Sequence, residues 1–125
     1  MADLQDLAAQ DFCYLTTTGR RTGKAHTIEI WFALATGVST LHLLAGGGYD
    51  ADWVRNIQQN PQVSVRIGTT LFAGGGRVVE DAAEEMQARH GVVKKYYGRD
   101  VVETSGWEAT ALPVALDLVL PGAPL

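Results

Sequence analysis

Residues 15–32, LTTTGRRTGKAHTIEIWF, join two stretches typical of β-strands through a basic turn. Residues 12–18 are rich in aromatic and β-branched side chains, and residues 26–34 alternate between two faces, as strand residues do. The turn GRRTGK, residues 19–24, holds three of the ten lysines and arginines in a chain of net charge −4. This concentration of positive charge on an acidic chain favours a binding site for a small anion.

The basic turn allows two interpretations. Gly19 and Gly23 let backbone N–H groups face an anion, and Arg20, Arg21 and Lys24 would add charge-assisted hydrogen bonds to phosphate oxygens. A solvated turn is the alternative. The spacing alone favours the solvated turn, because a short turn motif is a weak signal of function.

The rest of the hydrophobic pattern predicts a small β-barrel with helical attachments. Six strands are expected, at residues 12–18, 26–34, 41–45, 63–67, 71–79 and 113–120. Helices are expected at residues 3–10, around residue 53 up to the Asn60-Pro61 stop, and at 81–97 with a disturbance at Gly91. No strand–helix–strand repetition occurs, so a dinucleotide-binding fold is not predicted, and the length indicates one domain, 1–125.

Two glycine runs interrupt this pattern. Residues 46–48 end a strand before a helix, where free N–H groups favour an anion or a flat polar ring, and a flexible connection is the alternative. Asp50 or Asp52 would cap that helix. Residues 74–76 lie inside a strand and indicate a bulge, a barrel corner or the close approach of another segment.

Composition and charge argue against several classes of function. The acidic charge disfavours a general nucleic-acid binder, and the longest apolar runs are too short to span a bilayer. The lone Cys13 forms no intramolecular disulfide, is expected to be a small buried residue, and fits a reducing, cytoplasmic compartment. The three histidines lack the spacing of metal ligands, so no metal is predicted.

Five further residues remain open between packing and function. His26 would either direct a ring N–H at a bound phosphate or occupy the end of the barrel. Trp53 is expected to pack in the core or at an interface, and Asn56, one helical turn away, would cap or brace the glycine loop. Tyr96 and Tyr97 end the long helix, where a phenol would donate a proton in a pocket or otherwise serve as a surface residue.

Taken in order, these segments resemble the deazaflavin (F420)-dependent nitroreductase and quinone reductase family. TTTGRRTGKAH, LLAGGG and DWVRNIQQNPQVSVRIG carry the resemblance, which extends roughly from Phe12 to Leu120. Its most specific parts are the TTxGRxTG turn and the W-x-x-N-x-x-x-x-P segment. The resemblance implies an α+β, mainly β fold: a six-stranded antiparallel split β-barrel, FMN-binding-like, with two or three peripheral helices.

The family implies coenzyme F420, a deazaflavin with a phosphate and a glutamyl tail. By resemblance, Arg20, Arg21 and Lys24 would bind the anionic groups of the cofactor, and His26 stands where many members of the family have Arg. Ile28 and Ile30 would lie beside the ring. Ala45, Gly46 and Gly47 would offer backbone N–H groups, and Trp53 and Asn56 would support that loop. Glu29 is expected close to the ring or tail.

The resemblance also implies a homodimeric oxidoreductase that transfers a hydride from reduced deazaflavin to a quinone, enone or nitro compound. Tyr96 or Tyr97 would position this small-molecule acceptor or supply a proton, and Trp107 would form an apolar wall of its pocket. Two alternatives stay open: an FMN- or haem-binding module that carries or senses its ligand, and a structural dimer that binds no cofactor.

Overall fold

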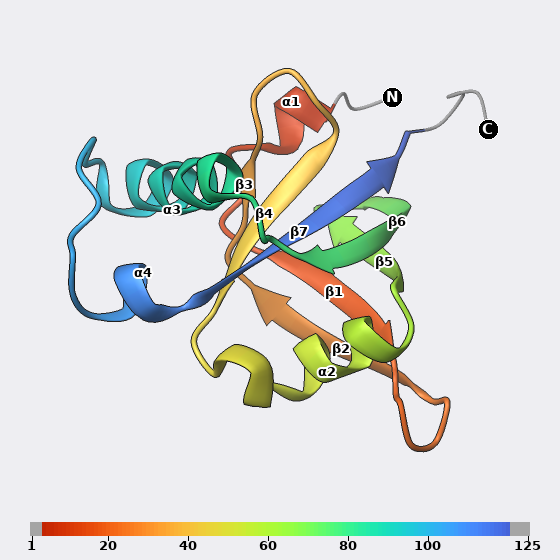
Figure 1. Ribbon diagram of the computed structural model, residues 1–125. Coiled ribbons are helices and arrows are strands. Elements are labelled where there is room, and N and C mark those ends of the chain that lie inside the picture. The colour runs from red at the N-terminus through yellow and green to blue at the C-terminus, as the bar shows by residue number, and fades with distance from the viewer. Residues whose placement is uncertain (1–3, 121–125) are drawn as a thin grey trace.

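The computed structural model describes residues 4–120 as one curled antiparallel sheet with helices around it (Figure 1). Its strands are β1 Cys13–Thr18, β2 Ala25–Ile30, β3 Ala33–Leu34, β4 Thr40–Ala45, β5 Gln62–Ile67, β6 Thr70–Val78 and β7 Leu112–Val119. The helices are α1 Leu4–Leu7, α2 Asp52–Gln59, α3 Ala82–Tyr97 and α4 Trp107–Thr110, with a short 3₁₀ helix, η1 Gly48–Asp50, before α2.

The strands pair in the order β2-β1-β5-β6-β7-β4-β3, and every ladder is antiparallel. β2 and β3 form the two edges and do not pair with each other, so the sheet curls into a half-barrel without closing. In the β1–β2 hairpin, Thr18 pairs with Ala25 and Cys13 pairs with Ile30. This register places the basic turn at one end of β2 and residue 31 at the other.

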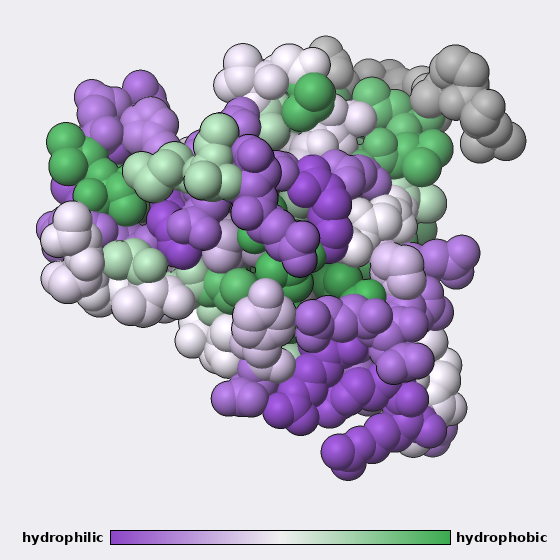
Figure 2. Space-filling view, in the orientation of Figure 1, coloured by the Kyte–Doolittle hydropathy of each residue, from purple (hydrophilic) through white to green (hydrophobic). Residues whose placement is uncertain are grey.

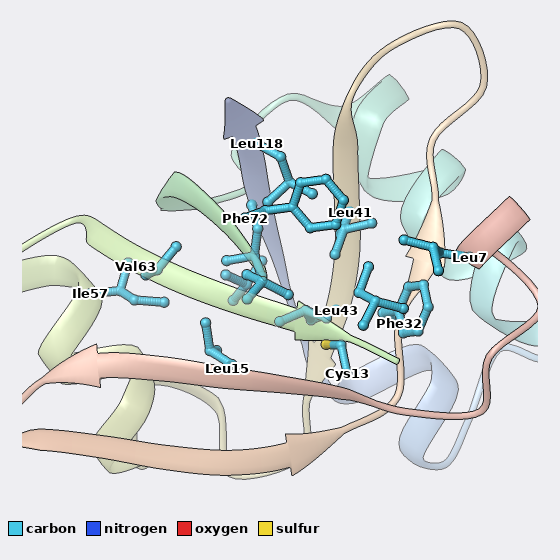
Figure 3. Close-up of a cluster of buried hydrophobic side chains, with 14 of the residues drawn as sticks. Leu7, Cys13, Leu15, Phe32, Leu41, Leu43, Ile57, Val63, Phe72 and Leu118 are labelled. Carbon is cyan, nitrogen blue, oxygen red and sulfur yellow. The ribbon is translucent and has the colours of Figure 1, made fainter. Parts of the chain in front are cut away.

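The hydrophobic core fills the inside of the half-barrel, where side chains from several strands converge (Figure 3). β1 confirms the strand predicted at residues 12–18 and alternates, with Cys13, Leu15 and Thr17 turned inward. Burial raises the pKa of the Cys13 thiol to about 12, which confirms the expectation of an inert buried residue. β4 is buried along its whole length because α3 packs on the strand as well.

The structure has seven strands rather than the predicted six, because the expected strand at 26–34 is broken at Trp31 and Phe32. Side chains of α3 bind the backbone at the break. The Tyr96 hydroxyl accepts a hydrogen bond from Phe32 N (3.0 Å), and Lys95 Nζ donates to Phe32 O (2.9 Å). Since these groups no longer need a strand partner, the chain leaves β1 and pairs with β4 as β3.

The first two helices are shorter or capped differently than expected. α1 spans Leu4–Leu7 within the predicted residues 3–10, and residue 3 lies outside the described residues. α2 begins after Ala51, and neither expected aspartate caps it with its side chain. Asp52 instead forms an ion pair with Arg20.

The long helix α3 lies across the β3–β4 end of the sheet (Figure 1) and is not interrupted at Gly91. A Cβ at Gly91 would lie 3.3 Å from the Ala33 side chain, so the glycine allows the helix to pack closely on β3. The sequence did not predict α4, a single turn that begins at Trp107. The Arg89 guanidinium donates to the carbonyls of Glu108 and Ala111 and stabilises that turn.

The glycines within β6 reflect close approach rather than a bulge. The pairing of β6 with β7 continues through all three glycines, and its pairing with β5 includes Gly74 and Gly75, in both cases without an extra residue. A Cβ at Gly74 would lie 2.7 Å from the carbonyl oxygen of Asp117, and one at Gly76 would lie 2.9 Å from Ile57 Cδ1. The glycines therefore admit β7 on one side and α2 on the other.

A charged network joins α3 to the strands beneath it. Arg77 donates to both oxygens of Glu84 at 2.7 and 2.9 Å, and to Asp117 at 2.8 Å. The buried His42 contacts Glu84 through Nε2 at 2.9 Å, and Thr40 donates to Asp117 at 2.7 Å. The hydrogen bonds from Arg77, more than the contact with His42, lower the pKa of Glu84 from 4.5 to about 2.

This network predicts a loss of stability in acid. Because the pKa of Glu84 is depressed in the folded protein, its stabilising contribution is complete above pH 4.5 and is lost as the pH falls towards about 2. We expect the unfolding free energy, measured by urea titration between pH 2 and 6, to decrease as the pH is lowered from 4.5 to about 2. Glu84→Gln should be less stable at neutral pH and less sensitive to acid. An unchanged acid dependence in Glu84→Gln would contradict the assignment.

Candidate functional site

A groove of about 540 Å³ lies between the basic turn, β2 and α2. It is lined by Thr17, Gly19, Arg20, Arg21, Thr22, Lys24, His26, Thr27, Ile28, Asp52, Trp53 and Asn56. Figure 2 shows the strongly hydrophilic surface over this lower part of the molecule. The structure thus brings together seven of the residues predicted to bind a cofactor, although they come from two separate segments of the sequence, 20–28 and 53–56.

The turn has a defined backbone conformation. Gly19 N donates to Lys24 O at 2.7 Å, Gly23 N donates to Gly19 O at 2.8 Å, and Gly23 has φ of 73°. The ring of His26 lies directly over Gly19, where a Cβ would come within 2.7 Å of His26 Nε2. Glycine is therefore required at position 19 to keep His26 on the groove, and at position 23 to close the turn.

Asn56 attaches the turn to α2. It is 3% exposed, and its Oδ1 accepts hydrogen bonds from Arg20 N (3.2 Å) and Arg20 Nη1 (2.9 Å). Its Nδ2 donates to the buried Thr17 Oγ1 at 3.1 Å. Asn56 thus braces the basic turn itself and not, as the sequence suggested, the glycine loop. Trp53, on the same helix, is half-buried against the core and also lines the groove.

The cations of the turn differ in their availability. Arg20 is engaged by Asn56 and by Asp52, whose Oδ1 lies 3.1 Å from Arg20 Nη2. Within residues 4–120, by contrast, the side chains of Arg21, Lys24 and His26 form no hydrogen bond or ion pair, and all three are exposed. Unpaired positive charge facing a groove is the arrangement that an anionic ligand neutralises.

β2 runs from this groove to its far end at Ile30, a length of five residue steps of about 3.4 Å, or about 17 Å in all. Ile28 lines the groove, and Ile28 and Ile30 pack against the core. Glu29 points to the opposite face of the strand, where its carboxylate accepts a hydrogen bond from the Tyr14 hydroxyl at 2.8 Å. Glu29 therefore does not face the groove, as the alternation of the strand implies.

An aromatic cluster occupies the far end of β2. Trp31 stacks on Tyr96 with ring centroids 4.1 Å apart, and the rings of Tyr97 and Trp107 each lie 6.0 Å from Trp31, edge to face. Sequence analysis named the last three residues but missed Trp31, which joins them. No signal in the sequence indicated this role, because the expected strand ran through position 31 to residue 34, and its end at Ile30 is known only from the structure.

The two tyrosines have different environments. The Tyr96 hydroxyl lies within 3.1 Å of Phe32 N, Phe32 O and Asp11 O, so backbone groups surround it. Burial raises the pKa of Tyr96 to about 12, which makes proton donation near neutral pH harder. The Tyr97 ring is about half exposed, and its hydroxyl has no hydrogen-bond partner in the described part of the chain.

The glycine loop approaches the aromatic cluster rather than the basic groove. A Cβ at Gly46 would lie 3.1 Å from Trp107 Nε1, so the indole rests against this glycine. Ala45 is buried at the end of β4, and Gly47 packs against Ala51. The structure therefore divides the predicted site residues into a cationic part and an aromatic part, with β2 between them.

Comparisons with known proteins identify the family. The model of the F420H(2)-dependent quinone reductase family matches residues 4–118, nearly the whole chain, and the chain belongs to this family. No curated protein matches the sequence. Across the described residues, no helix is long and apolar enough to cross a membrane. No group of three or more His, Cys, Asp or Glu among them could hold a metal ion.

Several solved structures share the fold. A putative 5-nitroimidazole antibiotic resistance protein from Bacteroides thetaiotaomicron is 14% identical, with a TM-score of 0.72 over 94% of this chain and 81% of its own. The F420-H2 dependent reductase FDR-A is 21% identical, with a TM-score of 0.63 over 86% of this chain and 94% of its own. A domain-swapped dimer is also 21% identical, with a TM-score of 0.63 over 86% and 80% of the two chains. These likenesses establish the split-barrel fold.

Proposed function

We propose that this protein is an F420H2-dependent reductase that transfers a hydride to a quinone or a related electrophile, an enone or a nitro compound. The observation that carries the proposal is the groove at the basic turn, where Arg21, Lys24 and His26 present unpaired donors. Membership of the F420H(2)-dependent quinone reductase family supports the same cofactor.

The residues of the groove fit a cofactor with a phosphate and an acidic tail. Arg21 and Lys24 would bind these anionic groups, and His26 would donate an N–H beside them. Arg20 would act mainly by holding the turn on Asn56 and Asp52, as its hydrogen bonds indicate. The bare face of Gly19 leaves room for His26 to lie flat against the groove.

The flat ring would extend along β2 towards the aromatic cluster, past Ile28 and Ile30. When bound in its reduced form, the deazaflavin supplies a hydride, and a quinone that takes up this hydride and one proton from water becomes the quinol. The protein's own part is to orient the two rings and exclude water between them. Exposed aromatic faces suit a planar apolar acceptor.

The aromatic residues would have different roles at the acceptor. Tyr96 would fix the orientation of Trp31 by stacking, while the unpaired Tyr97 hydroxyl would hydrogen-bond the acceptor or supply a proton. Trp107 would form a wall of the pocket. The backbone N–H groups of Gly46 and Gly47 would face the ring next to this wall. We further propose a cytoplasmic homodimer, supported by the domain-swapped dimer among the structural neighbours.

The test is a turnover assay with chemically reduced F420 and a soluble quinone such as menadione. Oxidation of F420H2 restores the cofactor's fluorescence, so the rate is followed directly. We expect saturable, protein-dependent turnover with the quinone, and screening with an enone and a nitroaromatic defines the acceptor class. Absence of turnover with all three acceptors, together with retained FMN or haem in the purified protein, would replace the proposal with the carrier or sensor function.

A further inference from the structure

We propose that Glu108 is a positioning residue that holds the indole N–H of Trp107 at the glycine loop, where it donates a hydrogen bond to a carbonyl oxygen of the acceptor. The inference rests on the proposed reductase function and adds to it a specificity for planar acceptors that carry a carbonyl oxygen, such as quinones. Three features of the structure lead to it.

The first feature is the clamp on Glu108. The side chain is 8% exposed, and both of its oxygens are bound by Arg99, at 2.7 Å to Oε1 and 3.1 Å to Oε2. The backbone N–H of Glu103 also donates to Oε2 at 2.8 Å. A buried carboxylate that receives three donors from one loop fixes that loop in a single conformation.

The second feature is the dependence of α4 on its neighbours. The helix has only four residues, too few to be stable in isolation. Arg89 of α3 donates to the carbonyls of Glu108 and Ala111, at 3.0 and 2.8 Å, and so holds the end of α4. Arg99 and Arg89 therefore act on one segment from two sides, and Trp107 is its first residue.

The third feature is the indole itself. Trp107 is 38% exposed, and its N–H has no hydrogen-bond partner within residues 4–120. Nε1 faces Gly46, where a Cβ would come within 3.1 Å of it, and the ring meets Trp31 edge to face. An unpaired donor held at a glycine, beside exposed aromatic faces, suits the oxygen of a flat ligand.

Such a hydrogen bond matters because the acceptor oxygen gains negative charge during reduction. A donor that is already aimed at this oxygen needs no reorganisation when the charge develops. A donor on a loose loop lacks this advantage. The ion pair between Arg99 and Glu108 keeps the segment next to Trp107 in one conformation.

The experiment compares Glu108→Gln, Trp107→Phe and their double variant in the quinone assay, with Glu103→Gln as the matched control on the same loop. Glu103 is exposed, and its carboxylate is 3.7 Å from Arg99. We expect each single variant to lower kcat/KM for menadione about 10-fold, because the lost hydrogen bond strengthens as charge develops on the acceptor oxygen. The affinity for F420 should stay within about twofold.

The double variant is decisive, because Glu108 is proposed to act through Trp107. We expect it to show no larger effect than Trp107→Phe alone, whereas additive losses would overturn the inference. Arg99→Gln should reproduce the effect of Glu108→Gln from the other side of the clamp. An unchanged kcat/KM in Glu108→Gln would also overturn it.

A readout without turnover separates this inference from the proposed function. The fluorescence of Trp107, obtained as the difference between each protein and its Trp107→Phe counterpart, should become more accessible to acrylamide in Glu108→Gln and not in Glu103→Gln. If quinone turnover is absent but this change occurs, the clamp stands and the proposed function fails. If the accessibility does not change, the clamp does not position Trp107.

Discussion

Replacing both Arg21 and Lys24 with alanine is expected to abolish measurable F420 binding at micromolar concentrations. Each single change should weaken binding about 10- to 100-fold, because each removes a charged hydrogen bond worth about 1.5–3 kcal/mol. Neither side chain has a partner in the described part of the chain, so its removal leaves no buried group unsatisfied. The loss should therefore appear in affinity, with little change in stability.

Lys94→Ala is the matched control for this prediction. It removes one positive charge from an exposed position on α3, where the amine forms an ion pair with Asp100 at 3.2 Å. Equilibrium titration followed by cofactor fluorescence measures the affinities, and raised salt should weaken wild-type binding more than that of either single variant. Equal affinity for wild type and double variant would remove the basic turn from the cofactor site.

Asn56→Ala is expected to reduce both stability and cofactor affinity. The change leaves Arg20 N and the buried Thr17 hydroxyl without their partner, which costs about 2–3 kcal/mol. The change also releases the basic turn from α2, so the turn must become ordered when F420 binds. We expect this entropic cost to weaken F420 binding about 10-fold, even under conditions in which the protein is fully folded.

Urea denaturation and the same fluorescence titration measure these two effects. Gln58→Ala removes an exposed amide from the same helix and should change neither. Asn56→Asp keeps an acceptor for Arg20 and should lose less stability than Asn56→Ala. A stable Asn56→Ala protein with wild-type affinity would show that the turn holds its conformation without this brace.

The sequence was sufficient to predict the local elements and the basic hairpin. Aromatic and β-branched residues identified β1, alternation identified the start of β2, and the change of period identified α2 and α3. The break between β2 and β3 could not be predicted, because it depends on Lys95 and Tyr96, more than sixty residues away, binding the backbone of Phe32. Such contacts leave no periodic signal.

The site was predictable in its residue types but not in their roles. Nothing in GRRTGK distinguishes Arg20, which binds Asn56 and Asp52, from Arg21, whose side chain has no partner among residues 4–120. The side of β2 on which Glu29 lies is implied by alternation, but its partner Tyr14 is known only from the strand register. The packing of Trp107 against Gly46 depends on α4, which the clamp around Glu108 holds in place.

The most direct test of the central claim is a parallel fluorescence titration of the purified protein with F420 and with FMN. We expect saturable F420 binding at micromolar concentrations or below, with FMN binding at least about 10-fold weaker, a difference of about 1.4 kcal/mol. Tighter binding of FMN, or saturable binding of neither cofactor, would contradict that claim.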